Sequence, residues 1–443
     1  MMVAVFIVGY LCIALEHPLR VNKAATALLL GTLVWVVYVL GDFSQVSVPE
    51  WWQTAHGTTD GVHPLLGYQV DGQLLHLTGE IAGLLFFLIG AMTIVELVDQ
   101  HEGFALVTAR IKTTNPVSML WLIGFLTFFM SSVLDNLTTT IVMVSLLRRL
   151  VRDQKARWIF VGAVVIAANA GGAWTVIGDV TTTMLWVRGK LDPLNIMRVL
   201  FVPSLICLVV PLVGLSFRLK GTSLAGTEEG AARGPEVSEQ GVPTELWRQR
   251  LFLALGVTGL ISVPVFKAVT HLPPFMGVLL SLGVMWVATE IVNTQVEEHV
   301  RTSTGVSAAL RKVDFGSVLF FLGILLAVGA LGASGLLGKL ALELDETIGN
   351  QSIIALVIGL VSAVVDNVPL VAAGIDMYSY PRGHSFWSLL AYCAGTGGSC
   401  LIIGSAAGVA AMGLENISFG RYLKDTAGWA LVGYLAGFGY LML

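Results

Sequence analysis

Two copies of a Val-x-Asp-Asn motif interrupt long apolar segments of the chain. The first copy ends in Asp135-Asn136, and the second ends in Asp366-Asn367, 231 positions later. A carboxylate surrounded by hydrocarbon is costly, so an aspartate at such a position usually has a function and a partner. Two copies in matching surroundings suggest one binding site that is assembled from the two halves of a duplicated chain.

Two glycine-containing segments supply further oxygen-bearing side chains. Segment 169–182 reads NAGGAWTVIGDVTT, and segment 396–405 reads TGGSCLIIGS. Adjacent glycines favour a break in a membrane helix, and a break exposes backbone carbonyls. Oxygen ligands without thiolate or imidazole suit alkali or alkaline-earth ions better than zinc or copper. The candidate ion-binding residues are therefore Ser131, Asp135, Asn136, Asn169, Gly171, Gly172, Thr175 and Asp179 in the first half, and Ser362, Asp366, Asn367, Thr396, Gly397, Ser399 and Ser405 in the second.

Simpler structural roles remain open for several of these residues. Asn136 and Asn367 could cap the helices that follow them. The threonines at 138–140 could bond the preceding helical turn, and Asp179 could be a solvated charge at a helix end. The two motif aspartates are harder to explain in this way, because no Lys or Arg stands at membrane depth to pair with them.

The composition is that of a polytopic membrane protein. The chain has 443 residues, 55% of them hydrophobic and 12% charged, with a mean hydropathy of +0.81. Soluble domains carry about 25% charged residues, so we expect a core that faces lipid. The four cysteines lack metal or redox spacing, and no basic patch interleaved with aromatics indicates nucleic-acid binding. We expect no cofactor.

Basic residues give the topology that we expect. Loops 16–23, 99–116, 148–157, 218–250, 294–314 and 413–426 carry 19 of the 25 Lys and Arg residues, so we place them in the cytoplasm. Loop 41–79 has none and is placed outside. Segments 117–147 and 351–378 are too short for two spans each, so we interpret them as re-entrant hairpins with an Asp-Asn pair at each turn. Spans are predicted near 2–15, 24–40, 80–98, 158–186, 199–217, 251–269, 275–293, 315–335, 387–412 and 427–442.

Landmarks of the first half recur in the second at nearly constant spacing. Phe86-Phe87-Leu88 matches Phe320-Phe321-Leu322, and Gly171-Gly172 matches Gly397-Gly398. Each half holds five spans and one hairpin, and an odd number of spans reverses orientation. We therefore predict an all-α fold of two inverted repeats with broken helices at the ion site. The first repeat is 1–217, a cytoplasmic linker is 218–250, and the second repeat is 251–443.

The paired Asp-Asn motifs, the segment 169–182 and the opening Glu16-His17-Pro18-Leu19 together resemble the NhaD-type sodium/proton antiporters of the ion-transporter superfamily. The resemblance covers essentially the whole chain. It implies exchange of cytoplasmic Na+, and also Li+, for external H+ across a bacterial cytoplasmic membrane by a homodimer. It adds Thr181 and Thr182 to the candidate residues, and it implies that Na+ binds at Asp135, Asn136, Asp366 and Asn367.

We hypothesise that protons and Na+ compete for one carboxylate-lined site, and that each bound form lets the site reorient. The unloaded, charged site crosses poorly because bare carboxylate in hydrocarbon is costly. Asp135 is the favoured proton carrier. One alternative is a sodium-coupled anion symporter or arsenite-type exporter on the same scaffold. An intramembrane enzyme is disfavoured because no HExxH or Gly-x-Ser-x-Gly motif is present. A passive channel fits paired hairpins less well than alternating access does.

Overall fold

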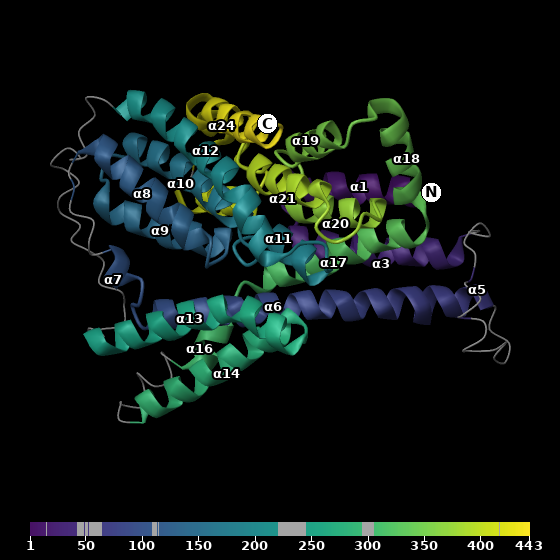
Figure 1. The fold of residues 1–443 in the computed structure, drawn as a ribbon, viewed down its shortest axis with the longest axis horizontal. Helices are drawn as coiled ribbons and strands as arrows, with labels where there is room; N and C mark the ends of the chain where they lie inside the picture. Colours follow the sequence, from purple (N-terminus) through teal and green to yellow (C-terminus); the bar gives the residue numbers. More distant parts are fainter. Residues whose placement is uncertain are drawn as a thin grey trace. The chain divides into compact units, whose positions relative to one another are not determined.

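The computed structural model of the chain consists of helices, and its described residues contain no β-strand (Figure 1). It describes residues 1–14, 16–41, 48, 52, 64–108, 113, 115–219, 245–294, 305–415 and 417–443. Within these ranges, seven helices are long and apolar enough to cross a membrane, and a pair of helices bent by 116° would make an eighth span. The chain is therefore a multi-pass, all-helical membrane protein. The predicted linker 218–250 lies mostly outside the described residues.

The seven long helices account for most of the predicted spans. They are α3 (Lys23–Leu40), the continuous helix made of α5 (Pro64–Gly67), η1 (Tyr68–Leu74) and α6 (Leu75–Gln100), α10 (Gln154–Ala173), α12 (Pro193–Leu219), α13 (Leu246–Thr270), α14 (Pro274–Asn293) and α17 (Phe315–Ala333). The expected loop 41–79 is wrong in its second part, because helix begins at Pro64. Polar side chains such as Asp71 and Gln73 lower the hydropathy there without breaking the backbone hydrogen bonds of a helix.

The chain folds into two compact units, each built from separate segments. The first comprises Met1–Leu88, Asp314–Ile354 and Val368–Tyr380. It includes α1 (Met2–Ala14), α2 (Glu16–Leu19), α3, α17 and α18 (Leu336–Ile348). At the contact of α3 with α17, a Cβ on Gly31 would lie 2.5 Å from the Gly323 carbonyl oxygen. Small residues thus let these two helix backbones touch, as in other membrane helix pairs.

The second unit comprises Ile89–Val313, Ala355–Asn367 and Pro381–Leu443, and it holds the motif residues. It contains the long helices α10, α12, α13 and α14 and the end of α6. Its shorter helices are α7 (Ala105–Thr108), α8 (Pro116–Ser131), α9 (Asn136–Leu150), α11 (Val180–Val187), α16 (Val306–Lys312), most of α19 (Gln351–Val361), α21 (Ser385–Gly397), α22 (Ala406–Glu415), α23 (Phe419–Tyr422), η3 (Leu423–Ala427) and α24 (Gly428–Leu441). In this unit α10 packs against α8, α9, α12 and α21. The α10 helix is thus the centre of the unit (Figure 1).

Both Asp-Asn motifs stand where a helix is interrupted, as the sequence predicts. α8 and α9 have 16 and 15 residues, or about 24 Å and 22 Å of helix. Each is shorter than the hydrocarbon layer of about 30 Å. In the second half, α19 (Gln351–Val361) ends before Ser362, and α20 (Asn367–Met377) begins at the motif asparagine. Pro369 is the third residue of α20, in the first turn, where proline removes no helical hydrogen bond.

The two predicted broken helices are also interrupted, and each break lies at or next to its glycine pair: α21 ends at Gly397 with Gly398 as its C-cap. α10 continues through Gly171 and Gly172 to Ala173, and α11 begins at Val180. A Cβ on Gly171 would lie 2.2 Å from the Phe128 carbonyl oxygen of α8. The helices thus break where the sequence predicts, one residue after Gly172 in the first half and at Gly397 in the second. Gly171 and Gly172 themselves remain helical. The α8 backbone passes too close to Gly171 for a side chain, and a Cβ on Gly172 would lie 2.4 Å from the Gly178 carbonyl oxygen.

Candidate ion-binding site

The aspartate of the first motif caps a helix. Asp135 is the N-cap of α9, and its carboxylate accepts hydrogen bonds from the Thr138 backbone N–H at 2.7 Å and the Thr138 hydroxyl at 2.6 Å. The alternative that Asn136 caps this helix is therefore wrong, since Asp135 fills that position. The Asn136 side chain is left to point elsewhere.

The side chain of Asn136 enters a buried polar network that we call the Asp179 network, made of Asn136, Asn169, Asp179, Asn367 and Ser405. The Asn136 amide donates to Asn169 Oδ1 at 3.0 Å and to Asp179 Oδ2 at 2.9 Å. The Asn169 amide in turn donates to the Ser405 hydroxyl at 2.9 Å. All five residues are at most 4% exposed. The network thus joins residues from both halves of the sequence.

Asp179 is the residue on which both motifs converge. It caps α11, and its Oδ1 accepts from the Thr181 backbone N–H at 2.8 Å and the Thr181 hydroxyl at 2.9 Å. Its Oδ2 accepts from Asn136 and, at 3.5 Å, from the Asn367 amide. All four of these donors are neutral. Asp179 is 1% exposed, so the alternative of a solvated helix-end charge is wrong.

Two other carboxylates of this unit act on Asp179. Asp135 and Asp366 both interact with Asp179 by Coulombic repulsion. Within the described part of the chain, however, no three His, Cys, Asp or Glu side chains are grouped closely enough to hold one metal ion together. An ion in this region would therefore need amide, hydroxyl or backbone oxygens in addition to carboxylate.

Contacts around the two breaks recur in pairs. Ser131 donates its hydroxyl to the Ala168 carbonyl at 2.6 Å, and Ser362 donates to the Ala394 carbonyl at 2.9 Å. A Cβ on Gly397 would lie 2.1 Å from the Gly359 carbonyl, which repeats the approach of Gly171 to α8. The seryl hydroxyls and the glycines therefore join each motif to its broken helix through the same kind of contact.

The two halves of the site differ at the positions that carry the chemistry. Asp179 follows Gly178 in the first break, whereas Ser405 follows Gly404 in the second. Asn169 stands two positions before the first glycine pair, and Gly395 holds that place in the second half. The equivalent scaffold contacts thus surround unequal sets of polar groups. Of the two breaks, only the first carries a carboxylate.

The remaining candidate hydroxyls bind backbone carbonyls. Thr175 donates to the Ser132 carbonyl at 2.7 Å, which joins the first break to the hairpin turn. Thr182 donates to the Asp179 carbonyl at 2.9 Å. Thr396 and Ser399 donate to carbonyls of their own segment, at Tyr392 and Thr396. These four residues shape the backbone of the breaks, and none of these hydrogen bonds joins them to an aspartate side chain.

Sequence reasoning missed part of the threonine run that follows the first motif. Thr138 bonds the Asp135 carboxylate instead of the preceding turn. The hydroxyls of Thr139 and Thr140 are buried and have no hydrogen-bond partner among the described residues. Since residues three and four positions apart share a helix face, both hydroxyls lie on the side of α9 that carries Asn136. The three consecutive threonines after an intramembrane Asp-Asn pair were the available signal.

Comparisons with known proteins connect this arrangement to ion transport. The family model described as citrate transporter matches residues 10–385. The chain is 47% identical over 440 residues to sodium/proton antiporter 1 of Arabidopsis thaliana, covering 98% of this chain and 71% of that protein. It is 42% identical over 448 residues to sodium/proton antiporter 2 of the same plant, covering 98% and 97%. The Na+/H+ antiporter NhaD of Alkalimonas amylolytica is 29% identical over 468 residues, covering 98% and 88%.

Proposed function

The chain belongs to the citrate transporter family, and from this premise we propose that it exchanges Na+ for H+ across a membrane at the Asp179 network. Relatives that cover nearly the whole chain are named as sodium/proton antiporters. The single observation that carries the proposal is the position of Asp179, whose buried carboxylate accepts hydrogen bonds from the asparagines of both motifs.

The electrostatics of the site explain why Na+ and H+ would exclude one another. Asp135 and Asp366 each repel the Asp179 carboxylate, and carboxylates that share a poorly solvated site cannot all remain charged without a cation. A proton relieves this repulsion, and so does Na+. Once either cation has bound, the repulsion that favours binding of the other is relieved. A single site therefore suffices for exchange.

The oxygen-bearing side chains supply what a sodium ion needs. Asn136, Asn169 and Ser405 already form a connected row of amide and hydroxyl groups beside Asp179. Such neutral oxygens, together with carboxylate, suit a hard cation. The unpartnered hydroxyls of Thr139 and Thr140 are further ligands within the same unit. We assign Na+ binding to the Asp-Asn pairs Asp135-Asn136 and Asp366-Asn367 together with this row.

The paired contacts at the breaks support a duplicated, inverted arrangement of repeats 1–217 and 251–443. In this proposal α8 with α9, and α19 with α20, are re-entrant hairpins that enter from opposite sides. Alternating access then moves cytoplasmic Na+, or Li+, outward in exchange for external H+. We further propose a homodimer. The relatives come from bacteria and from a plant, and the bacterial cytoplasmic membrane remains our proposal for the location.

The description of the matching family model favours one alternative, a sodium-coupled anion symporter. An organic anion would approach Asp179, which Asp135 and Asp366 already repel, and this is unfavourable unless cations bind first. An arsenite-type exporter on the same scaffold remains the other form of this alternative. Both forms of this alternative transport a substrate other than Na+ and H+.

Reconstitution of the purified full-length chain into proteoliposomes tests the proposal. A fluorescent pH indicator inside the vesicles should report proton movement after a pulse of NaCl, with choline chloride of equal ionic strength as the control. Exchange of labelled citrate should not occur. Citrate counterflow without any Na+-dependent proton flux would replace the antiporter assignment with the anion symporter.

A further inference from the structure

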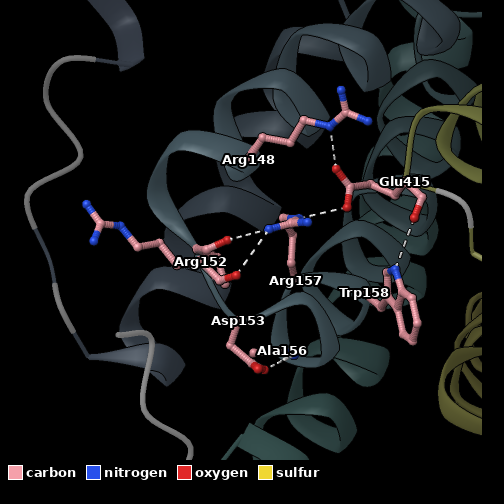
Figure 2. Close-up of polar contacts among 8 residues, drawn as sticks. Arg148, Arg152, Asp153, Ala156, Arg157, Trp158 and Glu415 are labelled. Atoms are coloured by element: carbon pink, nitrogen blue, oxygen red, sulfur yellow. Dashed lines mark hydrogen bonds and ion pairs between the residues drawn. The ribbon is translucent and has the colours of Figure 1, made fainter. Parts of the chain in front are cut away.

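A charged cluster of Arg148, Arg157 and Glu415 lies at the ends of α9, α10 and α22 that are far from the Asp179 network. The Glu415 carboxylate accepts from Arg148 Nε at 2.6 Å and from Arg157 Nε at 2.7 Å (Figure 2). The Glu415 side chain is 1% exposed. One buried carboxylate is therefore shared by two guanidinium groups, each of which approaches a different oxygen.

The cluster joins three helices and the connection between two of them. Arg148 belongs to the last turn of α9, and Glu415 is the last residue of α22. Arg157 stands in the first turn of α10 and also donates to the Val151 carbonyl at 2.9 Å, in the α9–α10 connection. The neighbouring Trp158 indole donates to the Glu415 backbone carbonyl at 3.2 Å (Figure 2).

The same three helices are joined a second time at the Asp179 network. There Asn169 of α10 lies between Asn136, the first residue of α9, and Ser405, which immediately precedes α22. On both α9 and α10 the two connections are twelve residues apart, which corresponds to about 18 Å of helix. Thus each of the three helices is held at one end by amides and a hydroxyl, and at the other by an ion cluster.

Helix stability alone does not explain a glutamate at the position of Glu415. The C-terminal end of a helix carries partial negative charge, so a carboxylate there is unfavourable. Burial adds a desolvation cost that only well-placed cations offset. Arg148 and Arg157 supply this compensation from two other helices. The arrangement therefore depends on the mutual position of α9, α10 and α22, and it stabilises that position in turn.

We propose that Arg148, Arg157 and Glu415 are positioning residues for ion exchange. By fixing the far end of α22 against α9 and α10, they keep Ser405 and Asn136 at the separation that Asn169 bridges. Without the cluster, the Asp179 network would hold the geometry that binds Na+ for only part of the time. The apparent affinity for Na+ falls in proportion to that fraction. This inference rests on the proposed Na+/H+ exchange, because it assigns the cluster an effect on Na+ affinity.

The test compares Glu415→Gln with Glu343→Gln, a substitution at an exposed glutamate of α18 in the other unit. Purified proteins in proteoliposomes are assayed for proton flux over a range of Na+ concentrations. Couplings between distant sites usually change affinity by about 5- to 150-fold, so we expect Glu415→Gln to raise the KM for Na+ at least fivefold. Glu343→Gln should leave the KM for Na+ unchanged. Arg148→Gln, which removes one of the two ion pairs, should raise it by less.

A second measurement separates an effect on folding from an effect on Na+ binding. It is the increase in unfolding temperature that NaCl causes relative to choline chloride. A Glu415→Gln protein that unfolds at lower temperature but keeps a wild-type KM for Na+ would overturn the inference and leave the cluster a purely structural role. If Glu415→Gln does not fold, an unchanged KM in Arg148→Gln overturns it equally. Absence of Na+-dependent proton flux in the wild-type protein would instead contradict the proposed function.

Discussion

Asn169 donates a hydrogen bond to the hydroxyl of Ser405 at 2.9 Å, although the two residues are 236 positions apart. Asn169 belongs to the first half of the chain and Ser405 to the second. The same Asn169 side chain accepts from Asn136, so one amide connects the first Asp-Asn motif to the second break. The polar site is therefore a joint product of both halves and not two separate sites.

Asn169→Ala removes both hydrogen bonds of this amide. Two buried hydrogen bonds are worth roughly 2 kcal/mol, which corresponds to about thirtyfold in an equilibrium constant. We therefore expect a KM for Na+ that is higher by about this factor, measured as proton flux in proteoliposomes. Asn195→Ala, at an exposed asparagine near the start of α12, is the control and should behave as wild type. Equal KM values in the two variants would exclude Asn169 from the site.

Asp179→Asn tests the convergence point of both motifs. The substitution keeps the size of the side chain but removes its charge, and the new amide nitrogen would face the donating amides of Asn136 and Asn367. We expect Na+-dependent proton flux to be lost while the protein still folds. Asp71→Asn, at an exposed aspartate of η1, is the matched control. Normal flux in Asp179→Asn would show that this carboxylate carries neither ion nor proton.

The close approach of the motif helices to the broken helices can be tested with alanine. A Cβ at Gly397 would lie 2.1 Å from a backbone carbonyl oxygen of α19, an atom that cannot move alone. Overpacking of this kind costs roughly 1–3 kcal/mol, so Gly397→Ala should lower the unfolding temperature and the transport rate. Gly413→Ala, in α22 with open space around it, should leave both unchanged. Equal stability of the two variants would mean that the helices do not pack this closely.

His101 makes stability depend on pH. Its ring stacks on Phe252 with centroids 3.5 Å apart, and its Nδ1 bonds the Leu97 carbonyl. Burial lowers the pKa of His101 from 6.5 to about 4, although the Leu97 carbonyl opposes the shift, and the charge of Arg248 adds to it. The unfolded chain therefore takes up a proton first as the pH falls, so stability decreases between about pH 6.5 and pH 4, by at most roughly 1.4 kcal/mol per pH unit.

The measurement for this prediction is the unfolding temperature of the purified protein at pH values from 7 to 4. His101→Phe keeps an aromatic ring against Phe252 but cannot titrate, so its unfolding temperature should fall less steeply over this range. A wild-type slope in His101→Phe would assign the pH dependence to other groups.

Much of the site could be predicted because its residues are costly in lipid. Asp135 and Asp366 stand out in apolar surroundings, and the interruptions of the helices lie where the motifs indicate. The pairing of side chains could not be predicted, because it depends on how helices from distant segments rotate against each other. The sequence favours Asp135 as the proton carrier, and this stays a prediction; the structure adds that Asp135 caps α9 and that Asp179 receives both asparagines. The breaks beside the glycine pairs could be predicted, but the close approach of another helix backbone to Gly171 and Gly397 could not, since the sequence does not show which backbone lies beside a glycine.

The central claim is that Na+ and H+ compete for one site, and proton release on Na+ binding tests it most directly. NaCl is added to the purified protein in weakly buffered detergent solution with a pH indicator, and choline chloride serves as the control. The account predicts that wild-type protein releases protons upon Na+ addition and that Asp179→Asn does not. Na+ that raises the unfolding temperature of the wild-type protein without releasing any proton would contradict competition at a shared site.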